Sequence, residues 1–234
     1  MIETAVMPAL IEGRTFDNVY DPAGQVIEDL ELRRCAFVAG GLGFRGDVRH
    51  RTLVRRVTLR DCTVAGAGIG PALLEDITVQ GLRTNGLLHV WGAAFKHVTL
   101  RGRIGRILIT DLTKPQLRTS PEQRAFSEAN AKFYKELDWA LDISEAEAEE
   151  LQLEGIPARL VRRDPATQIV VTRQAAQIGA WRELERSALT MGIEDMLDVG
   201  YPDMVLVAAK RSRHFQESLN TIQRLREIGV AEPD

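Results

Sequence analysis

The sequence has few cysteines, few aromatic residues and no long apolar run, and these shortages exclude several classes of protein. Two cysteines, Cys35 and Cys62, are too few for a disulfide-stabilised scaffold or a four-cysteine zinc site. No apolar stretch approaches the roughly 20 residues that a membrane-spanning helix needs. The first residues include Glu3 where a signal peptide would carry basic residues. We therefore expect a cytoplasmic protein without a membrane segment.

The chain also lacks a strong excess of charge of either sign. Its 234 residues carry a formal net charge of -3, which divides into +2 over residues 1–112 and -5 over residues 113–234. A nucleic-acid-binding domain usually has a pronounced basic patch, and a DNA-mimicking surface is strongly acidic. Nucleic acid is therefore not expected as a partner.

The first half contains an internal repeat. Four segments with the same pattern begin at Leu30, Val57, Ile77 and Val98, a period of about 20 residues with one insertion. Within the repeat, apolar residues recur at every fifth position: Ile27, Leu32, Phe37, Leu42, Leu59, Val64, Ile69, Leu74 and Val79. Small or apolar residues often stand two places earlier: Cys35, Gly40, Val57, Cys62, Ala67, Ala72 and Ile77.

A helix cannot use a period of five, whereas short strands stacked about 4.8 Å apart can bury both sets of residues. We therefore predict a mainly β fold in which residues 14–110 form a right-handed β-solenoid with about 20 residues per coil. Both sets should point inward. Glycine-rich stretches such as 65–70 suit the corners, because glycine adopts positive φ at little cost.

With these residues the segment resembles the pentapeptide-repeat family, in which a small residue stands two places before a central apolar one. The resemblance covers residues 14–110 and implies a four-sided right-handed β-helix; a generic right-handed β-helix is the alternative. It also implies a non-enzymatic scaffold that presents a rigid face to a protein partner. Some family members mimic DNA and inhibit type II topoisomerases, a role that the +2 charge of this half does not favour.

The pattern changes after Leu112, and we expect a linker at Thr113–Pro115. The predicted domains are therefore a solenoid with its N-terminal cap (residues 1–112) and a small, mostly helical α+β domain (residues 113–234). Capping and periodicity signals predict helices at 120–137, 144–155, 174–189 and from Ser212 to Gly229. Turn signals predict a β-hairpin of 159–162 with 169–172, and a strand at 204–208.

Two groups of basic residues are candidates for binding phosphate or carboxylate groups. Arg33, Arg60 and Arg101 hold equivalent positions in the repeat, with Gln80 between the last two and Arg103 nearby, so they predict a column of donors. The second group precedes the final helix, whose N-terminus favours anions, and consists of Lys210, Arg211, Arg213 and His214. The alternative for both groups is a solvated surface with ion pairs to acidic neighbours.

No catalytic constellation stands out, because GxSxG, HExxH and P-loop patterns are absent from the sequence. We predict no metal and no cofactor, and whether the protein is an enzyme stays open, with the non-enzymatic reading favoured. His89 and Trp91 share one strand face and form either a ligand platform or a packing contact. Cys35 and Cys62 are interpreted as core residues.

The sequence is therefore compatible with two functions. The first is a scaffold that binds a protein partner, and a homodimer is expected if one end of the strand stack is uncovered. The second is a small-molecule or anion-binding protein, or an enzyme, with its site between the two predicted domains.

Overall fold

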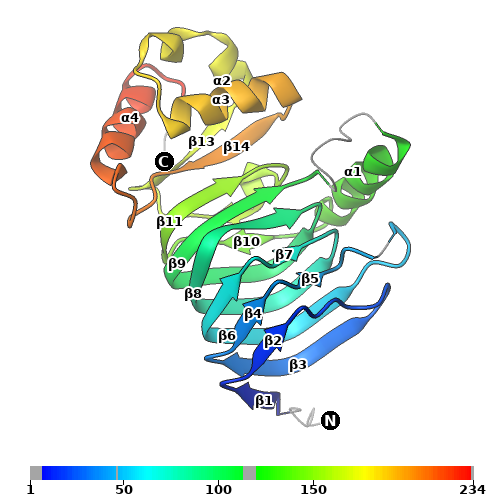
Figure 1. Cartoon of the computed structure of the whole chain (residues 1–234). Helices are drawn as coiled ribbons and strands as arrows, with labels where there is room; N and C mark the ends of the chain where they lie inside the picture. Colours follow the sequence, from blue (N-terminus) through cyan, green and yellow to red (C-terminus); the bar gives the residue numbers. More distant parts are fainter. Residues whose placement is uncertain (1–6, 46, 113–119, 233–234) are drawn as a thin grey trace, which may run out of the picture.

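The computed structural model describes residues 7–45, 47–112 and 120–232. Twelve strands in this part of the chain form one sheet, here called sheet A, whose main path runs β1-β3-β6-β8-β9-β10-β12. Its strand pairs are parallel. Figure 1 shows the sheet rising from the N-terminal strands to a unit of short helices around the separate pair β13–β14.

The strands before residue 112 make up most of sheet A. They are β1 (Ala9–Glu12), β2 (Thr15–Asp17), β3 (Val26–Arg33), β4 (Ala36–Val38), β5 (Gly41–Leu42), β6 (Leu53–Ala65), β7 (Gly68–Ile69), β8 (Leu73–Trp91) and β9 (Ala94–Thr110). Three further strands follow later in the chain: β10 (Leu141–Asp142), β11 (Ala146–Leu153) and β12 (Val161–Arg162).

The register of sheet A follows the repeat seen in the sequence. Leu32 pairs with Leu59, Leu59 with Val79, and Val79 with Leu100. The long strands β6, β8 and β9 bend at non-glycine residues with positive φ, namely Arg56, Asp61, Asp76 and His97. Such a conformation costs roughly 1–2 kcal/mol for most residues, less for Asp, so packing must hold it in place. The bends turn successive parts of one strand toward a common apolar interior.

The predicted fold class, a β-solenoid followed by a mostly helical domain, is wrong. The structure is an α/β arrangement with a mostly parallel sheet of twelve strands and few helices, and the described residues form no closed or solenoid sheet. The sheet continues past residue 112, because β10, β11 and β12 lie in the segment predicted to be mostly helical. A repeat period fixes which residues pair between neighbouring strands, but it does not fix where the sheet ends.

The predicted acidic helix at 144–155 is wrong because this segment forms β11. The residues Ala146, Ala148, Leu151 and Leu153 are buried, whereas the glutamates between them lie outward. This spacing buries one face of a strand, and the strand pairs with β9 from Ala146 beside Gly102 to Leu153 beside Ile109. The Ser144 hydroxyl donates to Asp142 at 2.6 Å instead of capping a helix.

The predicted hairpin at 159–172 is also wrong. β12 pairs with β10 in sheet A, whereas β13 (Gln168–Thr172) pairs antiparallel with β14 (Asp203–Val207). The predicted turn between β12 and β13 is present, since the N–H of Thr167 donates to the Asp164 carbonyl at 3.1 Å. The turn sequence therefore marks a change of direction, but it joins strands of different sheets. β14 confirms the strand predicted at 204–208.

Two of the predicted helices are confirmed and one is divided. α1 (Pro121–Tyr134) begins after Ser120, whose side chain accepts from the N–H of Gln123, and α4 (Phe215–Glu227) is the final helix, capped at His214 rather than Ser212. The third prediction is replaced by α2 (Arg173–Gln177), η2 (Ala180–Glu183) and α3 (Ala188–Val199), because Gly179 has φ +85°. A short η1 (Ala158–Leu160) precedes β12. The predicted linker at Thr113–Pro115 lies outside the described residues.

The described residues form two apolar cores. The larger lies inside sheet A and continues under β10, β11 and η1. The smaller joins β13 and β14 to α2, α3 and α4, with Trp181, Ile193 and Leu225 among its most buried side chains. In these parts of the chain, no helix is both long enough and apolar enough to cross a membrane.

Candidate functional site

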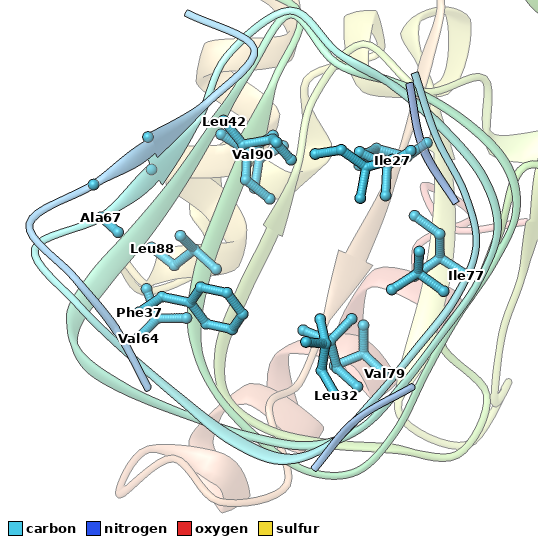
Figure 2. Close-up of a pocket in the computed structure, with 18 of the residues that line it drawn as sticks. Ile27, Leu32, Phe37, Leu42, Val64, Ala67, Ile77, Val79, Leu88 and Val90 are labelled. Atoms are coloured by element: carbon cyan, nitrogen blue, oxygen red, sulfur yellow. The ribbon is translucent and has the colours of Figure 1, made fainter. Parts of the chain in front are cut away.

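An apolar cavity of about 450 Å³ lies inside sheet A. Figure 2 shows inward side chains from successive strands, including Leu32, Val79 and Val90, arranged around it. Every residue of the five-residue periodicity lines this cavity: Ile27, Leu32, Phe37, Leu42, Leu59, Val64, Ile69, Leu74 and Val79. The prediction that these nine residues point inward is confirmed, although the sheet that carries them is not the predicted one.

The cavity is long and narrow. Its lining extends from Ile11 of β1 to Leu141 of β10. These strands are five steps apart on the path of sheet A, so the lining spans roughly 24 Å at about 4.8 Å per step. A volume of about 450 Å³ over this length corresponds to a narrow tunnel rather than a spherical cavity.

The wall offers apolar contact and very few hydrogen bonds. Asp21 is the one charged side chain among the described residues that line the cavity, and it is only 8% exposed. Its carboxylate accepts from the N–H of Gly43 at 2.7 Å and from the Thr52 hydroxyl. These donors satisfy the carboxylate, so the remaining wall can contribute dispersion and the release of water from apolar surface.

The cavity reaches the molecular surface at one end. Val19 and Tyr20 line it and are also 52% and 44% exposed, next to the N-terminal strands. At the other end Leu141 is fully buried, and β12 covers β10. A ligand would therefore enter beside β1 and β2.

The structure brings together the predicted column Arg33, Arg60 and Arg101. They stand in one register with Gln80, but their donors are directed at protein groups. Glu31 accepts from Arg33 at 2.9 Å and from Arg60 at 2.8 Å, and Gln80 accepts from Arg60 and from Arg101 at 3.3 Å. The hydrogen bonds from Arg60 and then Arg33 hold the pKa of Glu31 below its ordinary value. Arg103 lies apart, exposed on β9 in register with Glu147 of β11.

The second basic group lies beside β11 and contacts acidic side chains. Lys210 pairs with Asp164 at 2.9 Å, and Arg211 pairs with Glu149 at 2.8 Å. Partial burial opposes ionisation of Asp164, yet its pKa is lowered because Lys210 and nearby donors bind the carboxylate. Arg213 donates to His214 at 2.9 Å, and His214 contacts Glu217. Most of these basic side chains therefore bind acidic or amide groups of the protein, whereas the Nε of Arg101 is buried without a hydrogen-bond partner in the described part of the chain. Among the described residues, the two basic groups form no common cleft with the cavity.

His89 and Trp91 lie on the outer face of β8. Their rings stack with centroids 5.0 Å apart, and Phe44 meets Trp91 edge-on at 5.5 Å. The rings of Phe44 and Trp91 lie over Gly68 of β7, where an added Cβ would be 3.2 Å from Phe44 and 3.5 Å from Trp91. The pair thus packs against the sheet, away from the cavity.

Two buried or half-buried polar centres were not anticipated from the sequence. Arg51 is 9% exposed and donates to main-chain carbonyls, and His97 lies between the carboxylates of Asp76 and Asp138. Nothing in their local sequence distinguishes them from surface residues, because their partners are 20 to 79 positions away. Among the described residues, no three His, Cys, Asp or Glu side chains are grouped to hold a metal ion.

Comparison with known proteins gives no relative. No family model matches the chain, and no curated protein or solved structure is significantly similar to it. The class of the protein is therefore defined by its own fold, an α/β protein with a bent, mostly parallel sheet around an apolar cavity.

Proposed function

We propose that this protein binds an elongated apolar small molecule in the cavity of sheet A. The observation that supports this is the cavity itself, whose volume of about 450 Å³ falls within the roughly 300–1,000 Å³ of small-molecule sites. Its length favours a hydrocarbon chain over a compact ring system.

The energetic argument is that such a cavity is costly when empty. At roughly 24 cal/mol per Å³, about 450 Å³ corresponds to about 11 kcal/mol of lost packing. A typical domain is stable by only about 5–15 kcal/mol in total. Water is a poor occupant, because each buried molecule needs about 2–4 polar partners and the wall offers few. An alkyl chain restores the missing contacts without needing hydrogen bonds.

The chemistry at the open end favours a neutral head group. Asp21 lies in the segment between β2 and β3, beside the exposed lining residues Val19 and Tyr20. A carboxylate or phosphate head group near Asp21 would meet a like charge, whereas an alcohol or ester would not. We therefore expect long-chain alcohols or esters to bind more tightly than fatty acids of equal length.

The test is thermal unfolding of the delipidated protein with linear alcohols of increasing chain length. The melting temperature should rise with chain length until the chain fills the cavity and then level off. Fatty acids of the same lengths should give smaller shifts above pH 6. A melting temperature that does not respond to any of these chains would refute the proposal.

Two phenylalanine variants separate binding in the cavity from binding at the surface. Val79→Phe adds a ring to the cavity and should remove most of the alcohol-induced shift. Thr78→Phe adds the same ring on the opposite face of β8 and should leave the shift unchanged. Equal responses of the two variants would place the alcohol outside the cavity.

A second candidate function is a non-enzymatic protein-interaction role. One observation favours it: among the described residues, the N-terminal edge of sheet A combines strands that are paired on one side only with exposed apolar side chains, Leu10 at 52% and Val26 at 51%. Exposed edges of this kind are templates for association. The test is whether Leu10→Asp weakens association of the purified protein.

A further inference from the structure

We infer that two copies of this chain associate through the edge formed by β1 and β2, in a two-fold symmetric dimer that brings the two cavity openings together. This specifies the partner for the second candidate function and does not depend on a ligand in the cavity. Four features of the described residues lead to it: an unpaired edge, a covered opposite end, a self-complementary corner and apolar exposure.

The edge itself is built from two short strands that are paired on one side. In the described part of the chain β1 pairs only with β3, and β2 pairs only with β4. Among residues 7–232 as described, the N–H and C=O groups on their other side therefore have no strand partner. Natural proteins usually protect such an edge, for example with charge or a covering segment. Here Leu10, Val19 and Tyr20 are instead 52%, 52% and 44% exposed beside it.

The opposite end of sheet A is covered by the C-terminal unit, as Figure 1 shows. The N–H of Arg211 donates to the Ala148 carbonyl of β11 at 2.9 Å, and the Gln168 side chain donates to the Ile143 carbonyl at 3.0 Å. A chain with one free end cannot propagate a fibre by head-to-tail stacking. Its free end can instead pair with the same end of another copy, which gives a closed two-fold dimer.

The corner between β1 and β2 is complementary to itself. Gly13 turns the chain with φ +65°, and it stands between Glu12 and Arg14. A two-fold axis at this corner would run β1 of one copy antiparallel to β2 of the other. Ile11 opposite Phe16 of the second copy would keep both side chains directed into the cavities, since both line them. Glu12 of each copy would then lie close to Arg14 of the other.

This charge pattern favours a second copy over an unrelated partner. An edge that carried only one sign would repel itself, whereas one negative and one positive side chain on either side of an axis attract across it. Joining the edges would also bury the exposed apolar side chains and seal the two openings into one continuous cavity.

The first experiment is sedimentation velocity on the full chain over a range of concentrations. We expect a species of twice the 26.1 kDa chain mass. Leu10→Asp should weaken the association at least tenfold, because in this register position 10 lies opposite Asp17 of the second copy, so the substitution creates two pairs of like charges across the interface. The matched control is Ile178→Asp, which changes a 74% exposed apolar residue in the C-terminal unit and should leave the dimer intact. A monomer at all concentrations, or equal effects of the two variants, would overturn the inference.

The second experiment tests the proposed register without changing apolar area. Glu12→Arg should weaken the dimer by placing four positive side chains at the corner. The double variant Glu12→Arg with Arg14→Glu should restore it, because the opposite charges are exchanged. Loss of the Glu12–Arg34 pair is common to both variants, so it cannot explain a rescue. If the double variant stays as weak as the single one, this register is wrong.

The two proposals fail independently. Val79→Phe should remove most of the alcohol-induced thermal shift and leave the dimer unchanged, whereas Leu10→Asp should weaken the dimer at least tenfold and leave a measurable alcohol-induced shift. A melting curve of each variant without ligand verifies that it is folded.

Discussion

The guanidinium of Arg51 donates a 2.7 Å hydrogen bond to the side-chain oxygen of Asn130, which lies 79 positions later in the chain. The same guanidinium donates to the main-chain carbonyls of Pro71, Ala72 and Gly92 at 2.9–3.1 Å. It thereby links the segments that precede β6, β8 and β9 to α1. Its partners are neutral, and burial lowers the pKa of Arg51 to about 10.

Replacing Arg51 should therefore strongly destabilise the protein. In Arg51→Met the Pro71 carbonyl and the side-chain oxygen of Asn130 lose their donor, while the Ala72 and Gly92 carbonyls each lose one of two donors. Each hydrogen bond to a charged group is worth about 1.5–3 kcal/mol. The burial cost of the charge is regained, so we expect a net loss of about 3 kcal/mol in the free energy of unfolding. Urea denaturation measures it. Arg49→Met, at an exposed position nearby, should change stability by less than about 0.5 kcal/mol.

The sequence predicted the repeating interior but neither the extent of the sheet nor its polar centres. Leu32, Leu59 and Val79 could be placed inward because the recurrence of apolar residues at every fifth position can be recognised in the sequence itself. The segment of β11 has a helix-capping signal at Ser144, but the burial of Ala146, Ala148, Leu151 and Leu153 is that of a strand in sheet A. Local signals describe the start of a helix, whereas the pairing of β11 with β9 is a contact between distant segments.

The candidate site was missed for a related reason. Inward apolar residues predict a filled core, and only the three-dimensional radius of the sheet shows that side chains on opposite walls, such as Val79 and Val90, leave space between them. The basic residues were found, because charge is visible in sequence. An ion pair with an acidic neighbour such as Glu31 was the alternative to anion binding, and the structure shows that Glu31 and Gln80 accept hydrogen bonds from Arg60.

Acid should weaken the ion pairs on the outer face of β3 and β6. Arg55 first, and then Arg56, hold the pKa of Glu28 below its ordinary value, and Arg56 does the same for Asp29. A carboxyl group with a lowered folded-state pKa contributes stability above its unfolded pKa, near 4, and loses it as the pH falls through the folded value. Arg56→Gln should therefore be less stable than wild type at pH 7 and differ little from it at pH 2.

Urea midpoints at the two pH values measure this difference. Arg83→Gln is the control, because in the described residues Arg83 makes no ion pair, and its effect should not depend on pH. A deficit of Arg56→Gln that persists unchanged at pH 2 would show that packing of the Arg56 stem, rather than its charge, is responsible.

His97 should control the ionisation of Asp138. Its Nε2 lies 2.8 Å from an oxygen of Asp138, its Nδ1 lies 3.1 Å from Asp76, and its ring stacks on Trp139. This hydrogen bond is the main reason that the pKa of Asp138 is lowered. In His97→Leu the pKa of Asp138 should rise toward about 3.9. Carboxyl-carbon NMR titration of both proteins measures the shift, and an unchanged pKa would rule out the contact in solution.

The two thiols should be chemically silent in the native protein. Cys35 is 1% exposed and Cys62 is fully buried, and burial raises the pKa of the Cys62 thiol. The thiolate is the reactive form, so both low access and a raised pKa slow its reaction. We expect a colorimetric disulfide reagent to label both cysteines quickly in denaturant. Under native conditions labelling should be very slow, because it requires opening of sheet A.

The variant Val54→Ala removes buried apolar contact between β6 and its neighbour β3, so its native labelling should accelerate in proportion to the loss of stability measured in urea. Rapid native labelling of either cysteine would instead show that the interior of the sheet opens without global unfolding.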